Sequence, residues 1–209
     1  MRIRTDGDKS HRQDTIEAAA ERLDCNKTHA VLVSCDVVGN VLDGVEDALE
    51  HPDRVRNIVL FNPMGLEHNR PLPVSIAALP LPDLAYRFSP RFLVERVLRY
   101  LYGQPNALKD SVVDRYYELL LRDGNRDFLR QFVQRQPLPD EVLERSLRDV
   151  TVPVLLQWGC RDPWLPVELA NRFHKTLPNS SLITYLSAGH VPMEERPSQT
   201  ARDAKAFLS

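Results

Sequence analysis

The sequence predicts an α/β fold: a parallel sheet of about four strands, flanked by helices and interrupted by a helical insertion. Two observations support this prediction. Short apolar segments alternate with amphipathic helical patterns in the first third and in the last third of the chain. Between these parts, from about residue 66 to residue 150, the pattern is helical and contains no convincing strand.

The first third predicts a strand–helix–strand unit. Residues 30–35, AVLVSC, are short, apolar and rich in valine, as in a buried strand. Residues 37–50 repeat apolar side chains at helical spacing, and residues 55–61, VRNIVLF, predict a second strand. A unit with such short links is expected to have a right-handed crossover. A preceding helix is predicted over residues 13–24.

The middle of the chain predicts a helical cap that is inserted into the α/β core. A proline-rich segment opens this part. Helical spacing then predicts four helices, over residues 89–102, 106–122, 125–135 and 139–147. We therefore divide the chain into a first part of the core at 1–65, a helical cap insertion at 66–150 and the remainder of the core at 151–209.

The α/β pattern resumes in the last third. Residues 152–158, VPVLLQW, and 181–186, SLITYL, predict two further buried strands. Residues 166–177 between them predict a helix that begins at a proline, and residues 194–208 predict a closing helix. Open parallel sheets bind ligands beyond the carboxyl ends of their strands, so the loops after these strands are expected to carry the site.

Those two loops contain an aspartate and a histidine. Asp162 stands in GCRDPW after one strand, and His190 stands in SAGHVP after the next. A carboxylate hydrogen-bonded to a histidine fixes its tautomer and stabilises its charged form. Taken alone, Asp162 can be a turn residue before proline, and His190 can cap the last helix. Taken together, directly after two strands, they favour a catalytic pair.

These motifs resemble the C-terminal end of α/β-hydrolase-fold enzymes. In that family a Gly-x-x-Asp-Pro turn supplies the acid of a catalytic triad and an Ala-Gly-His turn supplies its base, often followed by a run like EERP at residues 194–197. The resemblance covers about residues 12–66 and 150–208. It implies a hydrolase with Asp162 as the acid and His190 as the base.

The resemblance places the nucleophile in the sharp turn after the first strand, normally written G-x-S-x-G. The residues here are SCDVVG, and their alignment puts Asp36 at the nucleophile and the backbone N–H of Val37 in the oxyanion hole. The turn needs small residues two before and two after the nucleophile. Ser34 meets that need, whereas Val38 is β-branched. Taking Ser34 or Cys35 as the nucleophile gives a poorer fit at both positions.

An aspartate nucleophile resembles the branch of the family that contains epoxide hydrolases and haloalkane dehalogenases, in which a carboxylate forms an ester intermediate. Dehalogenases hold the halide with a tryptophan after the aspartate, and Val37 in its place argues against halide release. Epoxide opening would use hydroxyl donors from the cap. The insertion contains Tyr100, Tyr102, Tyr116 and Tyr117. Packing within the helices is the favoured explanation of these tyrosines.

The resulting hypothesis is a hydrolase of a small apolar ester, epoxide or related substrate that works through Asp36, Asp162 and His190. Two alternatives stay open: a degenerate relative that binds a ligand or a protein without turnover, and a fragment without independent function. Asp36 itself can instead cap the helix that follows it, or replace the serine of a serine hydrolase.

The resemblance also predicts a truncated domain, because the family normally has further strands and an oxyanion loop before this point. The strand at 30–35 then lies at the edge of the sheet. A valine-rich edge strand pairs readily with another chain. We therefore expect a homodimer or a partner chain that covers this edge.

Composition argues against several other classes of protein. The net charge is −2 and Lys and Arg are spread along the chain, so neither nucleic acid nor an anionic membrane surface is expected as a partner. No apolar run approaches the roughly 20 residues of a membrane span, and the polar first residues do not resemble a secretion signal. Three cysteines, an odd number and without metal-ligand spacing, predict a reduced, cytoplasmic protein. We expect neither a metal nor another cofactor.

Overall fold

The structure is a computed structural model, and the residues that it describes are 30–34, 48–49, 55–69, 89–134 and 139–209. Some of the predictions lie outside the described residues: the helix at 13–24, the turn with Asp36 and Val37, and the helix at 37–50 apart from residues 48–49.

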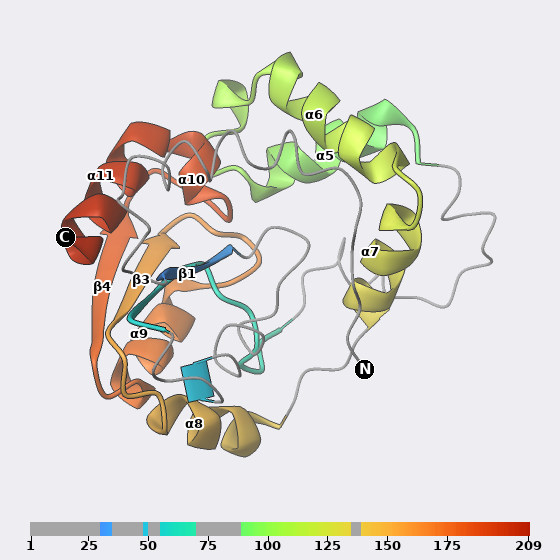
Figure 1. The fold of residues 1–209 in the computed structure, drawn as a ribbon. Helices are drawn as coiled ribbons and strands as arrows, with labels where there is room; N and C mark the ends of the chain where they lie inside the picture. The colour runs from blue at the N-terminus through green and yellow to red at the C-terminus, as the bar shows by residue number, and fades with distance from the viewer. Residues whose placement is uncertain (1–29, 35–47, 50–54, 70–88, 135–138) are drawn as a thin grey trace.

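Four parallel strands form one sheet among the described residues (Figure 1). They are β1 (Ala30–Ser34), β2 (Asn57–Phe61), β3 (Val154–Gly159) and β4 (Ser180–Tyr185), in the order β1-β2-β3-β4. Ser34 pairs with Phe61, and Phe61 pairs with Gln157, so the carboxyl ends of three strands meet at one edge. The predicted α/β fold with a parallel sheet is confirmed, and β1 lies at one side of the described sheet.

Helices cover both faces of this sheet. They are α8 (Asp140–Arg148), α9 (Val167–Thr176) and α11 (Pro197–Leu208). Successive side chains of a strand point to opposite faces, and β3 divides its core contacts accordingly. Leu156 is buried in one cluster with Leu143 of α8 and Phe173 of α9, whereas Leu155 is buried in another with Ala204 of α11. The helices α8 and α9 therefore pack on one face, and α11 packs on the other.

Further helical elements precede α8 in the chain, and the first of them lie on the side to which the arrows of β3 and β4 point (Figure 1). They are α5 (Arg91–Leu101), the 3₁₀ turn η1 (Pro105–Ala107), α6 (Asp110–Leu121) and α7 (Asn125–Gln134). The helix predicted over 106–122 is broken between η1 and α6. The break arises because Leu108 adopts an extended conformation that buries its side chain beside Leu98 and Val113.

Two other predicted elements differ from the structure. The closing helix begins as α10 (Pro192–Glu195) and restarts as α11, because Pro197 lacks a backbone N–H and disfavours the helical conformation at Arg196. The strand β4 was expected to be fully buried, but only Tyr185 is buried along its length. This strand lies at the second edge of the described sheet, where one of its faces is less completely covered.

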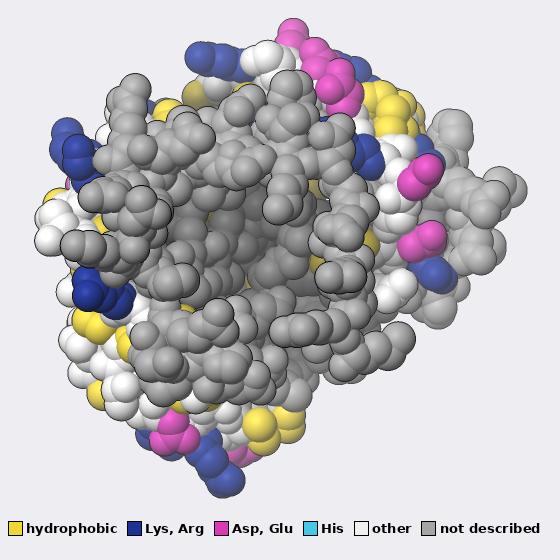
Figure 2. All heavy atoms as spheres, viewed as in Figure 1, with side chains coloured by type: hydrophobic (Ala, Val, Ile, Leu, Met, Phe, Trp, Pro, Cys, Tyr) yellow, Lys and Arg dark blue, Asp and Glu magenta, His cyan; other side chains and the backbone are white. Residues whose placement is uncertain are grey.

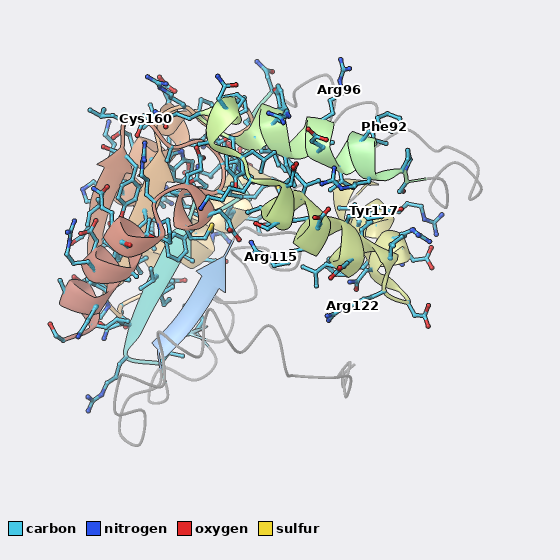
Figure 3. The ribbon with its side chains drawn as sticks, turned by 90° about the horizontal axis from the view of Figure 1, so that it is seen from above. Phe92, Arg96, Arg115, Tyr117, Arg122 and Cys160 are labelled. Carbon is cyan, nitrogen blue, oxygen red and sulfur yellow. The ribbon has the colours of Figure 1, made fainter. Side chains whose placement is uncertain are left out.

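The surface of the described residues mixes apolar and charged side chains. On the face shown in Figure 2, Lys and Arg are interspersed with Asp, Glu and hydrophobic side chains. The outer side of α5 exposes Phe92, Leu93 and Val97, and Figure 3 shows Phe92 and Arg96 projecting away from α6. Within the described ranges, no helix is long and apolar enough to cross a bilayer, and no three His, Cys, Asp or Glu side chains are grouped as metal ligands.

Asp140 links the start of the predicted insertion to its end and to the core. Its carboxylate accepts a hydrogen bond from the backbone N–H of Glu67 at 2.6 Å and pairs with Arg172 of α9 at 2.7 Å. Burial alone would raise the pKa of Asp140, but the bonds from Glu67 and Arg172 outweigh it, and the pKa is lowered. A lowered pKa means that folding favours the charged carboxylate.

Asp140→Asn is therefore expected to destabilise the fold in a pH-dependent way. The stability from a lowered pKa is present above the pKa of the unfolded carboxyl, about 4, and is lost as the pH falls through the folded pKa. For partly exposed groups we expect about 1 kcal/mol, or about 2–4 °C in melting temperature at pH 7, shrinking below about pH 4. Thermal unfolding of the two proteins across this pH range measures it. Glu141→Gln, at an exposed neighbouring position, is the control. If Asp140→Asn lowers the melting temperature by the same amount at pH 7 and below about pH 4, the charge of Asp140 does not stabilise the fold.

Candidate active site

The predicted carboxylate and imidazole meet at the carboxyl edge of the sheet. Nδ1 of His190 lies 2.8 Å from Oδ2 of Asp162, and both side chains are almost completely buried. Asp162 lies in the loop after β3, and His190 lies in the loop after β4, its neighbour in the sheet. The structure thus brings these two residues together, whereas Asp36 and Val37 lie outside the described residues.

Four hydrogen bonds hold the carboxylate of Asp162. Its Oδ1 accepts the backbone N–H groups of Trp164 at 2.7 Å and Leu165 at 2.9 Å. Its Oδ2 accepts from Nδ2 of Asn62 at 2.6 Å and from His190. Because a carboxylate only accepts hydrogen bonds, Nδ1 of His190 carries the proton, and Nε2 is the basic nitrogen. This is the tautomer that general-base catalysis requires.

Asn62 is a site residue that the sequence motifs did not identify. It directly follows β2, is completely buried and has a φ of 41°, in the left-handed region. Asparagine is one of the few residues other than glycine that enter this region readily. The side-chain Oδ1 of Asn62 accepts the backbone N–H of Gly159 at 3.1 Å. A polar residue directly after a buried strand, at the edge where the other site loops gather, is the signal that could have revealed it.

Aromatic side chains border the pair. The ring of Trp164 packs against that of His190, with 4.9 Å between centroids and 33° between planes. The hydroxyl of Tyr100 in α5 donates to the carbonyl of Pro163 at 3.2 Å. Burial and the nearby charge of Asp162 raise the pKa of Tyr100. The helix α5, in the predicted insertion, therefore contacts the acid loop directly at this point.

The other tyrosines of the insertion differ from Tyr100. Tyr102 is buried in the cluster that joins α5 to α6, and Tyr116 packs against the same cluster. Packing within the helices accounts for these two residues, which is the explanation that the sequence analysis favoured. Tyr100 differs because its hydroxyl bonds to the acid loop, at the carbonyl of Pro163.

Three glycines allow the backbone to approach the loop of His190 closely. A Cβ at Gly159 would lie 1.9 Å from the carbonyl oxygen of Gly189, and a Cβ at Gly189 would lie 2.2 Å from that of Leu101. A Cβ at Gly103 would meet the same loop at 2.6 Å. The backbone N–H of His190 donates to Leu101 at 2.8 Å. The histidine loop is therefore held between the end of β3 and the chain that leaves α5.

Glu195 reinforces this arrangement. Its carboxylate accepts the backbone N–H groups of Gly189 at 2.6 Å and Gln104 at 3.3 Å. Burial raises the pKa of Glu195, and the bonds from these backbone groups oppose that rise. Glu195 belongs to the EERP run at residues 194–197, which resembles a run in α/β-hydrolase-fold enzymes. The described contacts give that run a physical role, which is to join the histidine loop to the insertion.

Two family profiles match parts of the chain. A profile described as "TAP-like protein" matches residues 131–208, a stretch that includes both Asp162 and His190. A profile described as "Domain of unknown function (DUF7692)" matches residues 1–54.

Curated hydrolases are similar to most of the chain. It is 27% identical over 180 residues to a 2-hydroxy-6-oxo-6-phenylhexa-2,4-dienoate hydrolase of Comamonas testosteroni, which covers 82% of this chain and 62% of that protein. It is 25% identical over 178 residues to Lipase 1 of Psychrobacter immobilis, which covers 83% of this chain and 55% of that protein. The chain therefore spans less than two thirds of the length of these relatives.

A solved structure decides the fold. The chain overlays on an α/β-hydrolase-fold protein from Burkholderia ambifaria with a TM-score of 0.68 and 22% sequence identity, over 95% of this chain and 73% of that one. This chain has the α/β-hydrolase fold. The resemblance predicted from the Asp162 and His190 motifs is thus confirmed for the fold. In this α/β-hydrolase fold, the two motifs occupy adjacent loops at the carboxyl edge of the sheet.

Proposed function

We propose that this α/β-hydrolase hydrolyses a small, mainly apolar ester, epoxide or related substrate, with His190 as the base and Asp162 as the acid that orients it. The observation that carries the proposal is the 2.8 Å contact between His190 and an Asp162 carboxylate that three other groups hold in place. Such a pair prepares a histidine to remove a proton from a nucleophile or from water. The relatives support the reaction class, since they are named as a dienoate hydrolase and a lipase.

Asp36 is the nucleophile in this proposal. It stands two residues beyond Ser34, the last residue of β1, and Ser34 pairs with Phe61, which directly precedes Asn62. Two residues of chain span at most about 7 Å, and this short separation in sequence from the end of β1 supports the choice of Asp36 as the nucleophile. The backbone N–H of Val37 is the proposed donor to the oxyanion that forms during hydrolysis.

The proposed reaction has two steps. In an epoxide, a carboxylate oxygen of Asp36 attacks a ring carbon, the ring C–O bond breaks, and the released oxygen takes up a proton from solvent. His190 then removes a proton from water through Nε2, and the water oxygen attacks the carbonyl carbon of the ester. The C–O bond between this carbonyl carbon and the substrate oxygen breaks, the departing alcohol takes the proton from His190, and the carboxyl group of Asp36 returns a proton to solvent and is again a carboxylate.

Intact-protein mass spectrometry tests this proposal. The chain is incubated with epoxides, haloalkanes and activated esters beside Asp36→Asn and His190→Ala variants. A covalent adduct is expected on the parent chain and absent from Asp36→Asn. It is expected to accumulate on His190→Ala, because the water of the second step is no longer activated. Asp123→Asn, which replaces an exposed aspartate of a turn, is the matched control.

Two further variants separate the neighbouring nucleophile candidates. An adduct that survives in Asp36→Asn but is lost in Ser34→Ala or Cys35→Ala would move the nucleophile while keeping the hydrolase. If a folded, soluble sample gives no adduct and no turnover with any of these substrates, the proposed hydrolase function is wrong. A binding protein or a fragment without independent function then remains.

A further inference from the structure

The side chain of Asn62 is placed where it controls the acid of the catalytic pair. Its Nδ2 donates to Oδ2 of Asp162 at 2.6 Å, the oxygen that also accepts from His190. The two residues are 100 positions apart in sequence, and the contact is fully buried. Hydrogen bonds to a charged group in such a site are among the stronger ones in proteins.

Only one orientation of the Asn62 amide satisfies its surroundings. Its Oδ1 accepts the backbone N–H of Gly159, while its Nδ2 faces the carboxylate of Asp162. A flipped amide would set an oxygen against a carboxylate and an NH₂ group against an N–H donor. The amide therefore joins the end of β3 to the acid in a fixed geometry.

The backbone of Asn62 contributes to the same geometry. Its N–H donates to the carbonyl of Gln157 at 3.0 Å, which extends the pairing of β2 with β3 by one residue. The left-handed conformation that follows, with a φ of 41°, turns the chain out of the strand at this point. For most residues other than glycine this conformation is strained, although asparagine tolerates it better than most. Glycine would form the same turn without that strain, so the turn alone does not require asparagine.

We propose that Asn62 is a positioning residue of the active site, which holds the Asp162 carboxylate so that Oδ2 faces Nδ1 of His190 and thereby fixes the orientation and tautomer of the histidine. The proposal deepens the proposed hydrolase function and rests on it for its effect on turnover. Its structural part, the restraint on His190, stands independently of any substrate.

Asn62→Gly is the main test variant, because it keeps the left-handed turn and removes both side-chain hydrogen bonds. We expect kcat to fall by about ten- to a hundredfold with little change in KM, since the loss concerns the base and not substrate binding. Asn125→Ala is the matched control. It removes an amide hydrogen bond of 2.6 Å to Leu119 in the cap, and kcat is expected to stay unchanged.

Asn62→Asp provides a readout that a purely structural role would not move. At low pH the new carboxyl group is neutral, and its O–H can donate to Asp162 in place of the amide. At higher pH two carboxylates face each other and repel. The activity relative to the parent chain is therefore expected to fall as the pH rises. The other nearby titratable groups, Tyr100 at Pro163 and Glu195 at Gly189, are common to both proteins and cancel in this ratio.

Nuclear magnetic resonance of ¹⁵N-histidine-labelled protein tests the restraint without substrate. The ring N–H of His190, assigned by its loss in His190→Ala, is expected to exchange with water at least about tenfold faster in Asn62→Gly than in the parent chain. Unchanged exchange and an unchanged resonance in Asn62→Gly would overturn the proposal, whatever the activity. If that variant does not fold, the nearly isosteric Asn62→Asp carries the same measurement, and its exchange rate relative to the parent chain is expected to be higher at high pH than at low pH.

The two proposals fail in distinguishable ways. Suppose that ring N–H exchange is faster in Asn62→Gly but that the parent chain turns over no substrate. Asn62 is then still the residue that positions Asp162, and the proposed hydrolase function is wrong. Suppose instead that the parent chain turns over a substrate and that Asn62→Gly has the same kcat and the same exchange rate of the His190 ring N–H. The hydrolase function is then supported, and the proposed role of Asn62 is wrong.

Discussion

Asp162→Asn is expected to lower kcat by about 10³–10⁴-fold, through the wrong tautomer of His190. Two backbone N–H groups, from Trp164 and Leu165, converge on Oδ1 of Asp162, so the amide oxygen of the variant must take that position. Its NH₂ group then faces Nδ2 of Asn62 and Nδ1 of His190. Asn62 cannot flip to accept from it, because its oxygen already accepts from Gly159.

His190 is the group that can adapt. Its Nδ1 becomes an acceptor, its proton moves to Nε2, and the nitrogen that should act as the base is blocked. Steady-state kinetics with a substrate found by the adduct screen measures the loss. Asp203→Asn is the control, because Asp203 is a partly buried carboxylate that accepts from Tyr185 away from the site. Retention of more than a tenth of the parent kcat would show that Asp162 does not set the tautomer of His190.

Most of the fold was predictable because its signals are local. Strands β2 and β3 are mostly apolar runs, and the helices α5 and α9 repeat apolar residues at helical spacing. The positions of Asp162 and His190 followed from the same signals, since a loop directly after a buried parallel strand has a defined place in the fold. The two helix breaks each depend on a single position. Burial of Leu108 separates η1 from α6, and Pro197 separates α10 from α11.

The supports of the catalytic pair were not predictable in this way. The bond from Asn62 to Asp162 depends on the register between β2 and β3 and on a left-handed turn, neither of which the letters NPMG specify. The contact of Gly103 with the histidine loop joins residues more than 80 positions apart through backbone atoms alone, with no side-chain pattern to mark it. Local sequence thus identifies the reacting side chains, while their restraint is a property of the assembled fold.

Gly159→Ala is expected to destabilise the fold by about 3 kcal/mol or more, the upper range for overpacking in a core. The new Cβ would lie 1.9 Å from the carbonyl oxygen of Gly189 and 2.6 Å from that of Ala188. Both are backbone atoms, so no side-chain rotation can relieve the clash. The end of β3 and the loop of His190 must move apart, which also lengthens the contact between Asp162 and His190. For a chain of this size, the melting temperature should fall by about 6–12 °C.

Gly124→Ala separates this steric effect from the general cost of replacing a glycine. Gly124 has a φ of 81° and nothing within 4 Å of a built Cβ, so only backbone strain of about 1 kcal/mol is expected, or about 2–4 °C. Thermal unfolding by circular dichroism compares the two variants. Gly103→Ala, whose closest contact is 2.6 Å, should fall between them and serves if Gly159→Ala is insoluble. Equal melting temperatures for Gly124→Ala and Gly159→Ala would mean that the histidine loop is free to shift, and that the close backbone packing does not hold His190 in place.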